Sequence, residues 1–240
     1  MSAFFITGTD TEIGKTFVSS ALITLLVGEG LNVSVMKPIA SGAKLIDSEL
    51  KNDDALALMQ ASNMDLNYNE VNPYVFDAAT SPHLAAKDAG IEISLEKIKN
   101  NFIALEKKSD VVIVEGVGGW YAPLNDTETV ADLVKTLNQP IIIVVGLRLG
   151  CLNHALLTAE AIQQSGLPIV GWIANHVEAG FSAAENNIET LKLRLNNIPY
   201  LGFIPHVSQT EQNKNKDLSL STLKHIDNLN LNTLLKYLHK

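Results

Sequence analysis

The chain lacks several features that mark particular classes of protein. Cys151 is the only cysteine among 240 residues, so no disulfide can form within the chain. No apolar run approaches the roughly 20 residues that a membrane-spanning helix needs. The start of the chain has neither the basic segment nor the cleavage site of a signal peptide. These absences predict a cytoplasmic protein that does not enter a membrane.

Positive charge is also scarce. The chain has 18 lysine and arginine residues against 26 aspartate and glutamate residues, which gives a formal net charge of −8. This balance argues against binding to nucleic acid or to an anionic membrane through a broad basic surface. Any binding of phosphate groups must therefore occur at a local site.

Hydrophobic residues make up 46% of the chain, which is enough for one substantial core, so we expect residues 1–240 to form a single domain. Short apolar runs alternate with longer segments of helical periodicity. This alternation predicts an α/β, three-layer fold with a mostly parallel central sheet and helices on both faces. The expected strands are Phe4 to Thr7, Val33 to Met36, Val111 to Val114, Ile141 to Val145, Ile169 to Ala174 and Leu201 to Ile204. The expected helices are Lys15 to Glu29, Ser94 to Lys107, Thr129 to Leu137, Cys151 to Ser165, Ala183 to Asn196 and Asn230 to Leu238.

The first apolar run leads into a glycine-containing loop. From Gly8 to Thr16 the sequence reads Gly-Thr-Asp-Thr-Glu-Ile-Gly-Lys-Thr, and a helical segment follows. Backbone N–H groups of such a loop and of the helix start bind phosphate oxygens, while Lys15 and Thr16 can reach a terminal phosphate and its Mg²⁺. Five residues, instead of the usual four, separate Gly8 from Gly14. The pattern therefore predicts a P-loop that bulges or starts differently.

Acidic residues near the predicted strand ends are candidate Mg²⁺ ligands, because ligands bind beyond the carboxyl ends of the strands in open parallel sheets. Glu115 follows the run Asp110 to Val114, where P-loop proteins place a carboxylate that holds the metal. The alternative is a solvated acid at a strand end. Asp54 is either a second ligand or an acid that binds the free N–H groups of a helix start.

Other candidate ligand groups follow the same rule. Lys37 comes directly after the second strand and points at the same site as Lys15, unless it is a surface lysine. Gly116 to Gly119 allow close approach of the backbone to a ligand, or merely make a tight turn. The segment Gly150 to Asn153 precedes a helix whose free N–H groups suit a carboxylate. Cys151 is interpreted as a small packed residue, because no partner base is identifiable from the spacing.

Several segments taken together carry a more specific signal. They are Gly8 to Thr16, Lys37 to Gly42, Asn72 to Tyr74, Thr80 to His83, Val114 to Trp120 and Gly150 to Ala155. In this order, from the N-terminus to about residue 206, they resemble the dethiobiotin synthetase family. The resemblance accounts for the loop length, because the family's P-loop has the longer interval. Members of the family close a cyclic urea on 7,8-diaminopelargonic acid with CO₂ and ATP in the presence of Mg²⁺, the penultimate step of biotin synthesis.

The resemblance also implies roles for particular residues. Lys37 would be the catalytic residue, with Lys15 beside the same phosphate, and Thr16, Asp54 and Glu115 would hold Mg²⁺. The implied ATP-binding residues are Glu12, Ile13, Gly14, Lys15, Thr16, Phe17, Asp54, Glu115, Gly116, Val117, Gly118, Asn175, His176, Ile204, Pro205, His206 and Glu211. The implied residues for the diamine substrate are Thr11, Lys37, Ser41, Gly150, Cys151 and Asn153.

The family is a homodimer, which implies a substrate site shared across the interface. The aliphatic chain would cross to the neighbouring subunit, and its carboxylate would meet the helix start at Gly150. Two departures stand out. The family often has a tyrosine near the carboxylate where this chain has Asn187, and the sequence diverges after His206. Glu211 lies in that divergent part, within a polar stretch from Gln209 to Leu218 that we expect to be an exposed loop.

Two other classes of protein remain as alternatives. A partitioning-type regulatory ATPase usually carries an additional lysine early in its P-loop, where this chain has Thr9, Asp10 and Thr11. An ATP-dependent ligase or amidotransferase domain that acts on a larger acid, such as a corrin, would lead us to expect a glutaminase segment, and none follows. Phosphate release from Mg-ATP separates these classes. The synthetase needs both diaminopelargonate and bicarbonate, whereas lipid, DNA or protein stimulates a regulatory ATPase.

Overall fold

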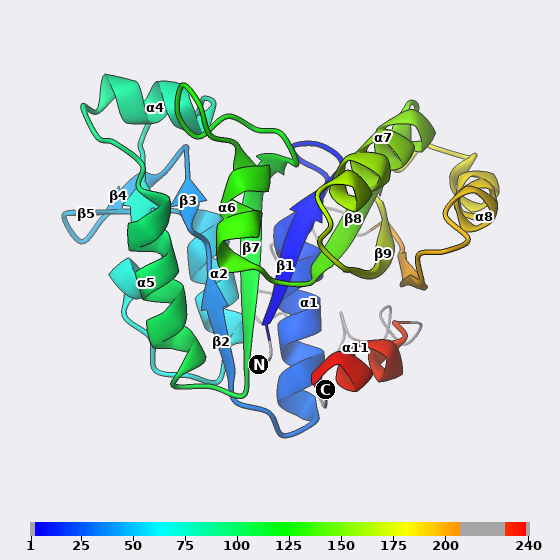
Figure 1. The fold of residues 1–240 in the computed structure, drawn as a ribbon, viewed down its shortest axis with the longest axis horizontal. Coiled ribbons are helices and arrows are strands. Elements are labelled where there is room, and N and C mark those ends of the chain that lie inside the picture. Colours follow the sequence, from blue (N-terminus) through cyan, green and yellow to red (C-terminus); the bar gives the residue numbers. More distant parts are fainter. Residues whose placement is uncertain (1–2, 207–228, 239–240) are drawn as a thin grey trace.

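The computed structural model describes residues 3–206 and 229–238, and within them a six-stranded sheet forms the centre of the molecule (Figure 1). Its strands are β1 (Ala3–Gly8), β2 (Val33–Met36), β7 (Val111–Gly119), β8 (Ile141–Leu147), β9 (Ile169–His176) and β10 (Tyr200–Ile204). They lie in the order β10-β9-β8-β1-β7-β2, and every neighbouring pair is parallel. The predicted parallel sheet is confirmed.

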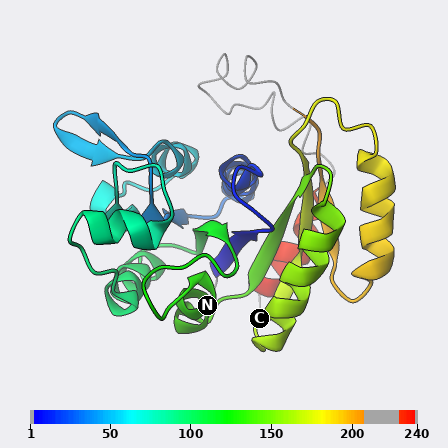
Figure 2. The same ribbon diagram turned by 90° about the horizontal axis from the view of Figure 1, so that it is seen from above.

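Helices cover both faces of this sheet, as the alternation of apolar and helical segments predicts. They are α1 (Lys15–Gly28), α2 (Asp53–Ala61), α3 (Tyr68–Val71), α4 (Pro82–Asp88), α5 (Leu95–Glu106), α6 (Val130–Leu137), α7 (Cys151–Gln164), α8 (Ala184–Arg194) and α11 (Leu231–Leu238). Helices α1 and α2 pack together on one face, and α5 and α6 pack together on the other (Figure 2). None of the described helices is long and apolar enough to cross a membrane.

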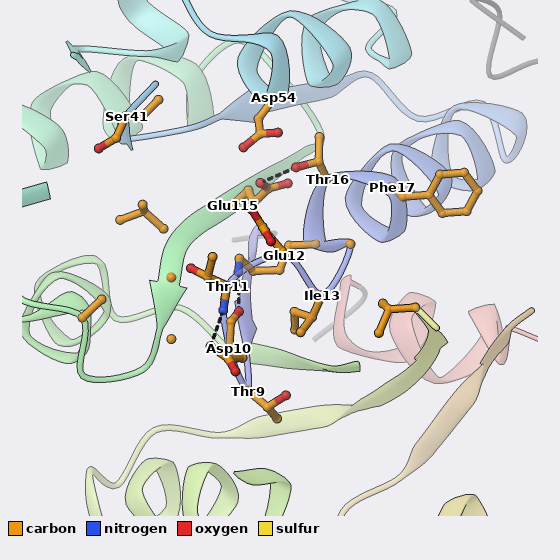
Figure 3. Close-up of a pocket in the computed structure, with 18 of the residues that line it drawn as sticks. Thr9, Asp10, Thr11, Glu12, Ile13, Thr16, Phe17, Ser41, Asp54 and Glu115 are labelled. Carbon is orange, nitrogen blue, oxygen red and sulfur yellow. Dashed lines mark hydrogen bonds between the residues drawn. The ribbon is translucent and has the colours of Figure 1, made fainter. Parts of the chain in front are cut away.

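The segment between β2 and α5 contains small elements that the sequence did not predict. Strand β3 (Ile39–Ala40) pairs with β6 (Tyr74–Val75), and β4 (Lys44–Ile46) forms a hairpin with β5 (Glu49–Lys51). Strands of two or three residues are too short to show a periodic pattern. Ser41 and Asp54 flank the hairpin in the sequence and lie beside the same pocket (Figure 3).

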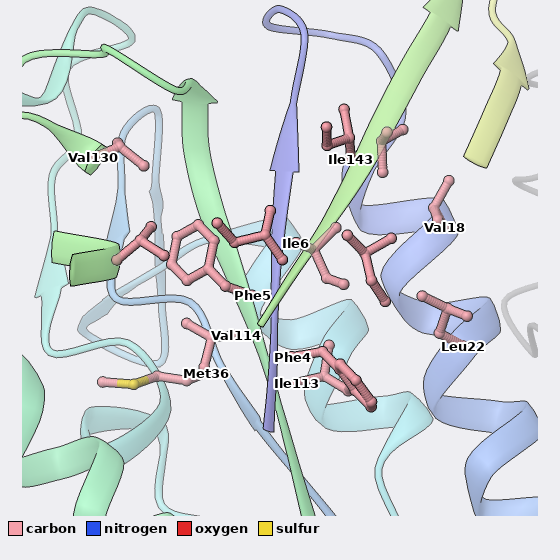
Figure 4. Close-up of a cluster of buried hydrophobic side chains, with 14 of the residues drawn as sticks. Phe4, Phe5, Ile6, Val18, Leu22, Met36, Ile113, Val114, Val130 and Ile143 are labelled. Atoms are coloured by element: carbon pink, nitrogen blue, oxygen red, sulfur yellow. The ribbon is translucent and has the colours of Figure 1, made fainter. Parts of the chain in front are cut away.

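The core is built on strands that are buried on both faces. All residues of β1 are buried, and so are all those of β8. Because successive side chains of a strand point to opposite faces, Phe4 points toward α1, whereas Phe5 points toward Val130 of α6 (Figure 4). Continuous apolar strands therefore need a helical layer on each side, which is the physical basis of the predicted three-layer fold.

One strand boundary differs from the prediction in a way that matters for the site. The predicted third strand ends at Val114, but β7 continues to Gly119. Glu115 therefore lies inside a strand of the central sheet, paired in register with Ile6 of β1. The glycines that follow were not predicted as strand, because glycine weakens a strand pattern. The polar stretch from Gln209 to Leu218, with Glu211, lies outside the described residues.

Candidate active site

A cavity of about 1260 Å³ lies beyond the carboxyl ends of the central strands. Its walls come from the P-loop, the ends of β2 and β7, and the segments that follow β9 and β10 (Figure 3). The predicted site residues that line it are Thr11, Glu12, Ile13, Gly14, Lys15, Thr16, Phe17, Lys37, Ser41, Asp54, Glu115, Val117, Gly118, Asn175, His176, Pro205 and His206. Residues distant in the sequence thus meet at one edge of the sheet, as the strand-end rule predicts.

The long P-loop is accommodated by its own backbone and by one buried side chain. Glu12 and Gly14 both have positive φ, 55° and 76°, in the left-handed region that favours glycine. Between them Ile13 turns into the core, where it is 1% exposed. Ile13 packs directly over Gly146 of β8, since a Cβ built on Gly146 would lie 2.7 Å from the Cβ of Ile13. The predicted bulge is therefore a loop anchored through Ile13.

A buried charged cluster forms one wall of the cavity. Lys37 Nζ lies 2.6 Å from Glu115 Oε1 and 2.9 Å from Asp54 Oδ2. The hydroxyl of Thr16 donates to the same Glu115 oxygen over 2.9 Å. Burial opposes the charged form of Lys37, but the carboxylates of Glu115 and Asp54 outweigh it and raise the pKa of Lys37. Burial likewise disfavours the Asp54 anion, but Lys37 outweighs it and lowers the pKa of Asp54.

This geometry decides between the alternatives that the sequence left open. Lys37 is 3% exposed and Glu115 is fully buried, so the surface lysine and the solvated acid are both wrong interpretations. Asp54 does lie in the first turn of α2, but its side chain pairs with Lys37 and does not supply the cap of the helix. Asn52 supplies the cap of α2, because its side-chain oxygen accepts from the backbone N–H of Asp54 at 3.0 Å and of Ala55 at 3.4 Å.

Lys15, on the P-loop, has a different set of partners. Its ammonium donates to the backbone carbonyl of Asp10 over 2.8 Å, and the residue is 7% exposed. Burial, followed by the positive charge of Lys37, lowers the pKa of Lys15 to about 8. Lys15 is thus a buried amine that lacks a carboxylate at hydrogen-bond distance among the described residues and is ready for an anionic ligand.

The donor set of the cluster fits Mg²⁺. Glu115 Oε2 is buried without a hydrogen-bond partner among the described residues, and such an orphaned oxygen calls for a donor or a cation. Asp54, Glu115 and Thr16 together offer two carboxylates and a hydroxyl. The described part of the chain has no group of three or more histidine, cysteine or acidic residues that could enclose a metal alone. Mg²⁺ commonly completes such a shell with substrate phosphates and water.

Some predicted site residues do not line this cavity. Gly116 and the buried Ile204 lie in the strands β7 and β10 behind its wall. Gly150, Cys151 and Asn153 lie at the start of α7 and do not line the cavity of their own chain. Cys151 is buried, which raises the pKa of its thiol, and its Sγ lies 3.8 Å from Asn187 Oδ1. Its environment is that of a packed residue.

The structure also reveals contacts that sequence reasoning missed. The Asp10 carboxylate forms an ion pair with Arg148, which precedes α7, and Asp10 Oδ2 lies 3.9 Å from His154 Nδ1. The P-loop is thereby linked to the start of α7. Residues 79–82 line the cavity too, although the sequence assigned them no role. An unusual loop length was the only sequence signal near Asp10, and it does not identify a partner 138 positions away.

The fold and the cavity define a nucleoside-triphosphate-binding protein of the P-loop class. A family model described as an AAA domain matches residues 2–214. Among solved structures, the cell division protein MinD of Aquifex aeolicus has a TM-score of 0.59 at 14% identity, with 100% of this chain and 98% of that chain covered. A ParA family ATPase from Chlorobium tepidum TLS has a TM-score of 0.51 at 14% identity, with coverages of 99% and 98%. At such identities the likeness concerns the fold alone.

Curated relatives give the family. "ATP-dependent dethiobiotin synthetase BioD" of Xylella fastidiosa (strain 9a5c) is 49% identical, with 86% of this chain and 91% of that protein covered. Its namesake in Vibrio parahaemolyticus serotype O3:K6 is 40% identical, with coverages of 95% and 100%. The chain belongs to the ATP-dependent dethiobiotin synthetase family. This relationship confirms the predicted resemblance and the predicted enzyme class, an ATP-dependent cyclo-ligase.

Proposed function

We propose that the protein closes a cyclic urea on 7,8-diaminopelargonic acid with CO₂ and ATP, and releases dethiobiotin, ADP and phosphate. The single observation that carries this assignment is the buried cluster of Lys37, Glu115 and Asp54 beside the P-loop. It places cationic and metal-binding groups at one end of a cavity large enough for a nucleotide and a second small substrate. Membership of the family supports the same reaction.

The proposed reaction proceeds through a carbamate and a mixed anhydride. One substrate amine attacks CO₂ and loses a proton, which gives a carbamate. A carbamate oxygen then attacks the γ-phosphorus of ATP, and the bond to the bridging oxygen breaks with release of ADP. The second amine attacks the carbamoyl carbon of the anhydride, the C–O bond breaks, and phosphate leaves with the oxygen that came from CO₂. Loss of the amine proton completes the cyclic urea.

The lysines supply what this chemistry requires. The carbamate and the γ-phosphate are both anions, so their mutual repulsion must be screened before they can meet in line. Lys37, held between two carboxylates, is placed to stabilise the transferred phosphoryl group. Lys15 has no carboxylate at hydrogen-bond distance in the described chain and is placed to bind the terminal phosphates. The carboxylate partners of Lys37 thus suit phosphoryl transfer, and the carbonyl partner of Lys15 leaves it able to bind phosphate.

Magnesium fits the remaining donors of the cluster. Thr16, Asp54 and Glu115 would hold it, and the buried unpaired oxygen of Glu115 supports this role. When bound, Mg²⁺ neutralises charge on the β- and γ-phosphates of ATP. The ammonium of Lys37 lies within hydrogen-bond distance of both carboxylates and lowers the pKa of Asp54.

The rest of the cavity suits the other parts of the two substrates. Thr11 and Ser41 would contact the carbamate region, and the Ser41 hydroxyl is buried without a partner among the described residues, which supports a ligand contact. Asn175, His176, Pro205 and His206 would surround the adenine. The Asn175 side chain donates to the Ile13 carbonyl over 2.8 Å, which joins this adenine side to the phosphate loop.

We further propose a homodimer with a shared substrate site and a single domain of residues 1–240 in the cytoplasm. The helix start at Gly150, Cys151 and Asn153 does not line the cavity of its own chain, which supports a role toward a second subunit. Leu149, beside it, is 92% exposed. An exposed leucine next to a helix N-terminus suits the meeting of an aliphatic chain and its terminal carboxylate.

Phosphate release from Mg-ATP tests the proposal. The purified protein is expected to release phosphate only when the diamine and bicarbonate are both present, with dethiobiotin detected by mass spectrometry in equal amount. Omission of either substrate is the control. Release that needs neither, or that lipid, DNA or protein stimulates, would instead indicate a regulatory ATPase.

A further inference from the structure

Three polar side chains outside the cavity connect three of its walls. They are Asn52, Tyr68 and Asn72, and we call them the amide–phenol relay. Tyr68 Oη accepts from the backbone N–H of Asn52 over 2.7 Å and donates to Asn72 Oδ1 over 2.8 Å. Asn52 and Asn72 are buried, at 7% and 1% exposure, whereas Tyr68 is half-buried. No member of the relay lines the cavity.

The partners fix the direction of every bond in the relay. A backbone N–H only donates, so Tyr68 must accept from Asn52, and its single hydrogen is left for Asn72 Oδ1. The amide nitrogen of Asn72 then faces two backbone carbonyls that only accept, Lys37 O at 2.7 Å and Tyr74 O at 3.0 Å. Neither the phenol nor the Asn72 amide can reverse without breaking these bonds.

Each outer end of the relay meets the backbone of a residue that lines the cavity. Asn72 binds the Lys37 carbonyl. Asn52 uses its amide nitrogen to donate to the Ser41 carbonyl over 3.2 Å and its oxygen to accept from the Asp54 N–H over 3.0 Å. Lys37 follows β2, Ser41 follows β3 and Asp54 lies in the first turn of α2. Their relative positions therefore depend on contacts between distant segments.

The local sequence explains how the relay forms. Tyr68 and Asn72 are four residues apart across α3, which places both on one side of a helical turn. Asn52 directly precedes α2 and adopts the extended backbone of a helix cap. A neighbouring tyrosine provides a contrast. The hydroxyl of Tyr74 accepts from the backbone N–H of Ser94 over 2.9 Å, and Ser94 does not line the cavity.

We propose that Asn52, Tyr68 and Asn72 are positioning residues that hold Lys37, Ser41 and Asp54 in register for phosphoryl transfer, an inference that rests on the proposed function. Lys37 and Asp54 must lie within hydrogen-bond distance of each other, and Ser41 must face the substrate beside them. The relay fixes the three backbones from behind the wall. Groups that orient metal-binding or catalytic residues in this way commonly change activity or metal affinity by about 10- to 100-fold when removed.

Tyr68→Phe tests this role, with Tyr74→Phe as the matched control. Each change removes one hydroxyl that accepts a backbone N–H bond and keeps the aromatic ring. We expect Tyr68→Phe to lower kcat of diamine-dependent phosphate release about tenfold, with the KM for ATP within about twofold of wild type. Tyr74→Phe keeps kcat within about twofold. Similar melting temperatures for the two variants would show that the difference is not one of stability.

Deuterium exchange gives a readout besides activity. Tyr68→Phe is expected to speed exchange of the backbone amides around Lys37 and at Asp54 and Ala55, whereas Tyr74→Phe leaves them unchanged. Asn52→Ser adds a separate arm, because serine still caps α2 but cannot donate to Ser41. It should raise the KM for the diamine several-fold more than it lowers kcat.

The outcomes separate the relay from the reaction itself. If wild type needs diamine and bicarbonate but Tyr68→Phe matches Tyr74→Phe in kcat and in exchange, the relay is ruled out and the proposed function stands. If wild type shows no diamine-dependent release, the proposed function fails. Faster exchange at Asp54 in Tyr68→Phe alone would then still support the relay as the device that positions these segments, and unchanged exchange would overturn it.

Discussion

The P-loop side of the cavity and the side formed by β2 and α2 each contribute one buried lysine, and the pKa values of the two lysines shift in opposite directions. Lys37 is within hydrogen-bond distance of Glu115 and Asp54, which raise its pKa against burial. Lys15 is bonded to a backbone carbonyl, and burial lowers its pKa to about 8. The pKa of the same residue type thus shifts in opposite directions, because the carboxylates beside Lys37 outweigh its burial, whereas burial and the charge of Lys37 prevail at Lys15.

The difference indicates separate roles for the two lysines. The positive charge of Lys37 is already compensated inside the chain, so Lys37 stays protonated and in place without a ligand. The charge of Lys15 is stabilised fully only when an anion arrives, which couples its protonation to phosphate binding. Loss of Lys37 should therefore affect catalysis and stability together. Loss of Lys15 should affect mainly the binding of nucleotide.

The largest expected effect comes from Lys37→Ala. Loss of the ammonium removes charge where the transition state develops it, so kcat should fall by about 100-fold or more in a phosphate-release assay. The structure also implies a cost in stability. Glu115 would remain buried without its partner, which costs about 3–5 kcal/mol in the free energy of unfolding.

The double variant Lys37→Ala/Glu115→Gln separates these two effects. It removes the uncompensated charge, so urea unfolding should recover much of the lost stability while turnover stays absent. A single variant Lys37→Ala with wild-type turnover would refute the assigned role of Lys37.

The binding of nucleotide should depend on pH through Lys15. The pKa of Lys15 is about 8 in the free chain, and a bound phosphate raises it, so binding takes up a proton above that pH. The affinity for a non-hydrolysable ATP analogue is expected to be flat below pH 8 and to fall about tenfold per pH unit above it. Isothermal titration measures this slope.

Lys15→Met is the matched control for that slope. It should bind the analogue weakly at every pH, with no break near 8. If the affinity of Lys15→Met fell above pH 8 as steeply as that of wild type, the pH dependence would belong to another group. The proposed difference between the two lysines would then not hold.

A smaller effect is expected from Gly146→Ala, which disturbs the loop side alone. The new Cβ would lie 2.7 Å from the Cβ of Ile13, and overpacking of this kind costs about 1–3 kcal/mol. The melting temperature and the affinity for nucleotide should both fall, while deuterium exchange around Lys37 stays unchanged. Gly28→Ala is the control, because a Cβ there meets nothing within 4 Å. Equal effects of the two variants would show that Ile13 does not anchor the loop.

The smallest expected effect belongs to Arg148→Gln, which breaks the ion pair with Asp10. Both side chains are about one third exposed, and exposed ion pairs contribute about 0–1 kcal/mol. Chemical unfolding should show a loss below about 1 kcal/mol that shrinks further at high salt. A loss of several kcal/mol would mean that the loop depends on α7 more than on Ile13.

The sequence predicted the fold better than the contacts within the site. Apolar runs such as Ile141 to Val145 are long enough to indicate buried parallel strands, and the loop from Gly8 to Thr16 indicates a P-loop in its strand and helix context. The two-residue pairing of β3 with β6 and the relay through Tyr68 have no such local signal. They join segments that are distant in the sequence, so only the folded chain reveals them.

Among the site residues, the sequence indicated which side chains are chemically suitable and the resemblance indicated where to look. Neither gave their environments. Glu115 was expected just after the end of a strand, because the glycines that follow it do not resemble a strand, yet β7 continues past it. The opposite pKa shifts of Lys15 and Lys37 likewise depend on which carboxylates fold against them, which spacing along the chain does not encode.

The route of one oxygen atom tests the proposed reaction most directly. The reaction is run with Mg-ATP, the diamine and ¹⁸O-labelled CO₂, and the released phosphate is examined by mass spectrometry before label exchanges with water. Attack of a carbamate oxygen on the γ-phosphorus predicts phosphate that carries one ¹⁸O atom derived from CO₂. Phosphate that carries no oxygen from CO₂ would have taken its new oxygen from water. That result would show simple hydrolysis of ATP and contradict the proposal.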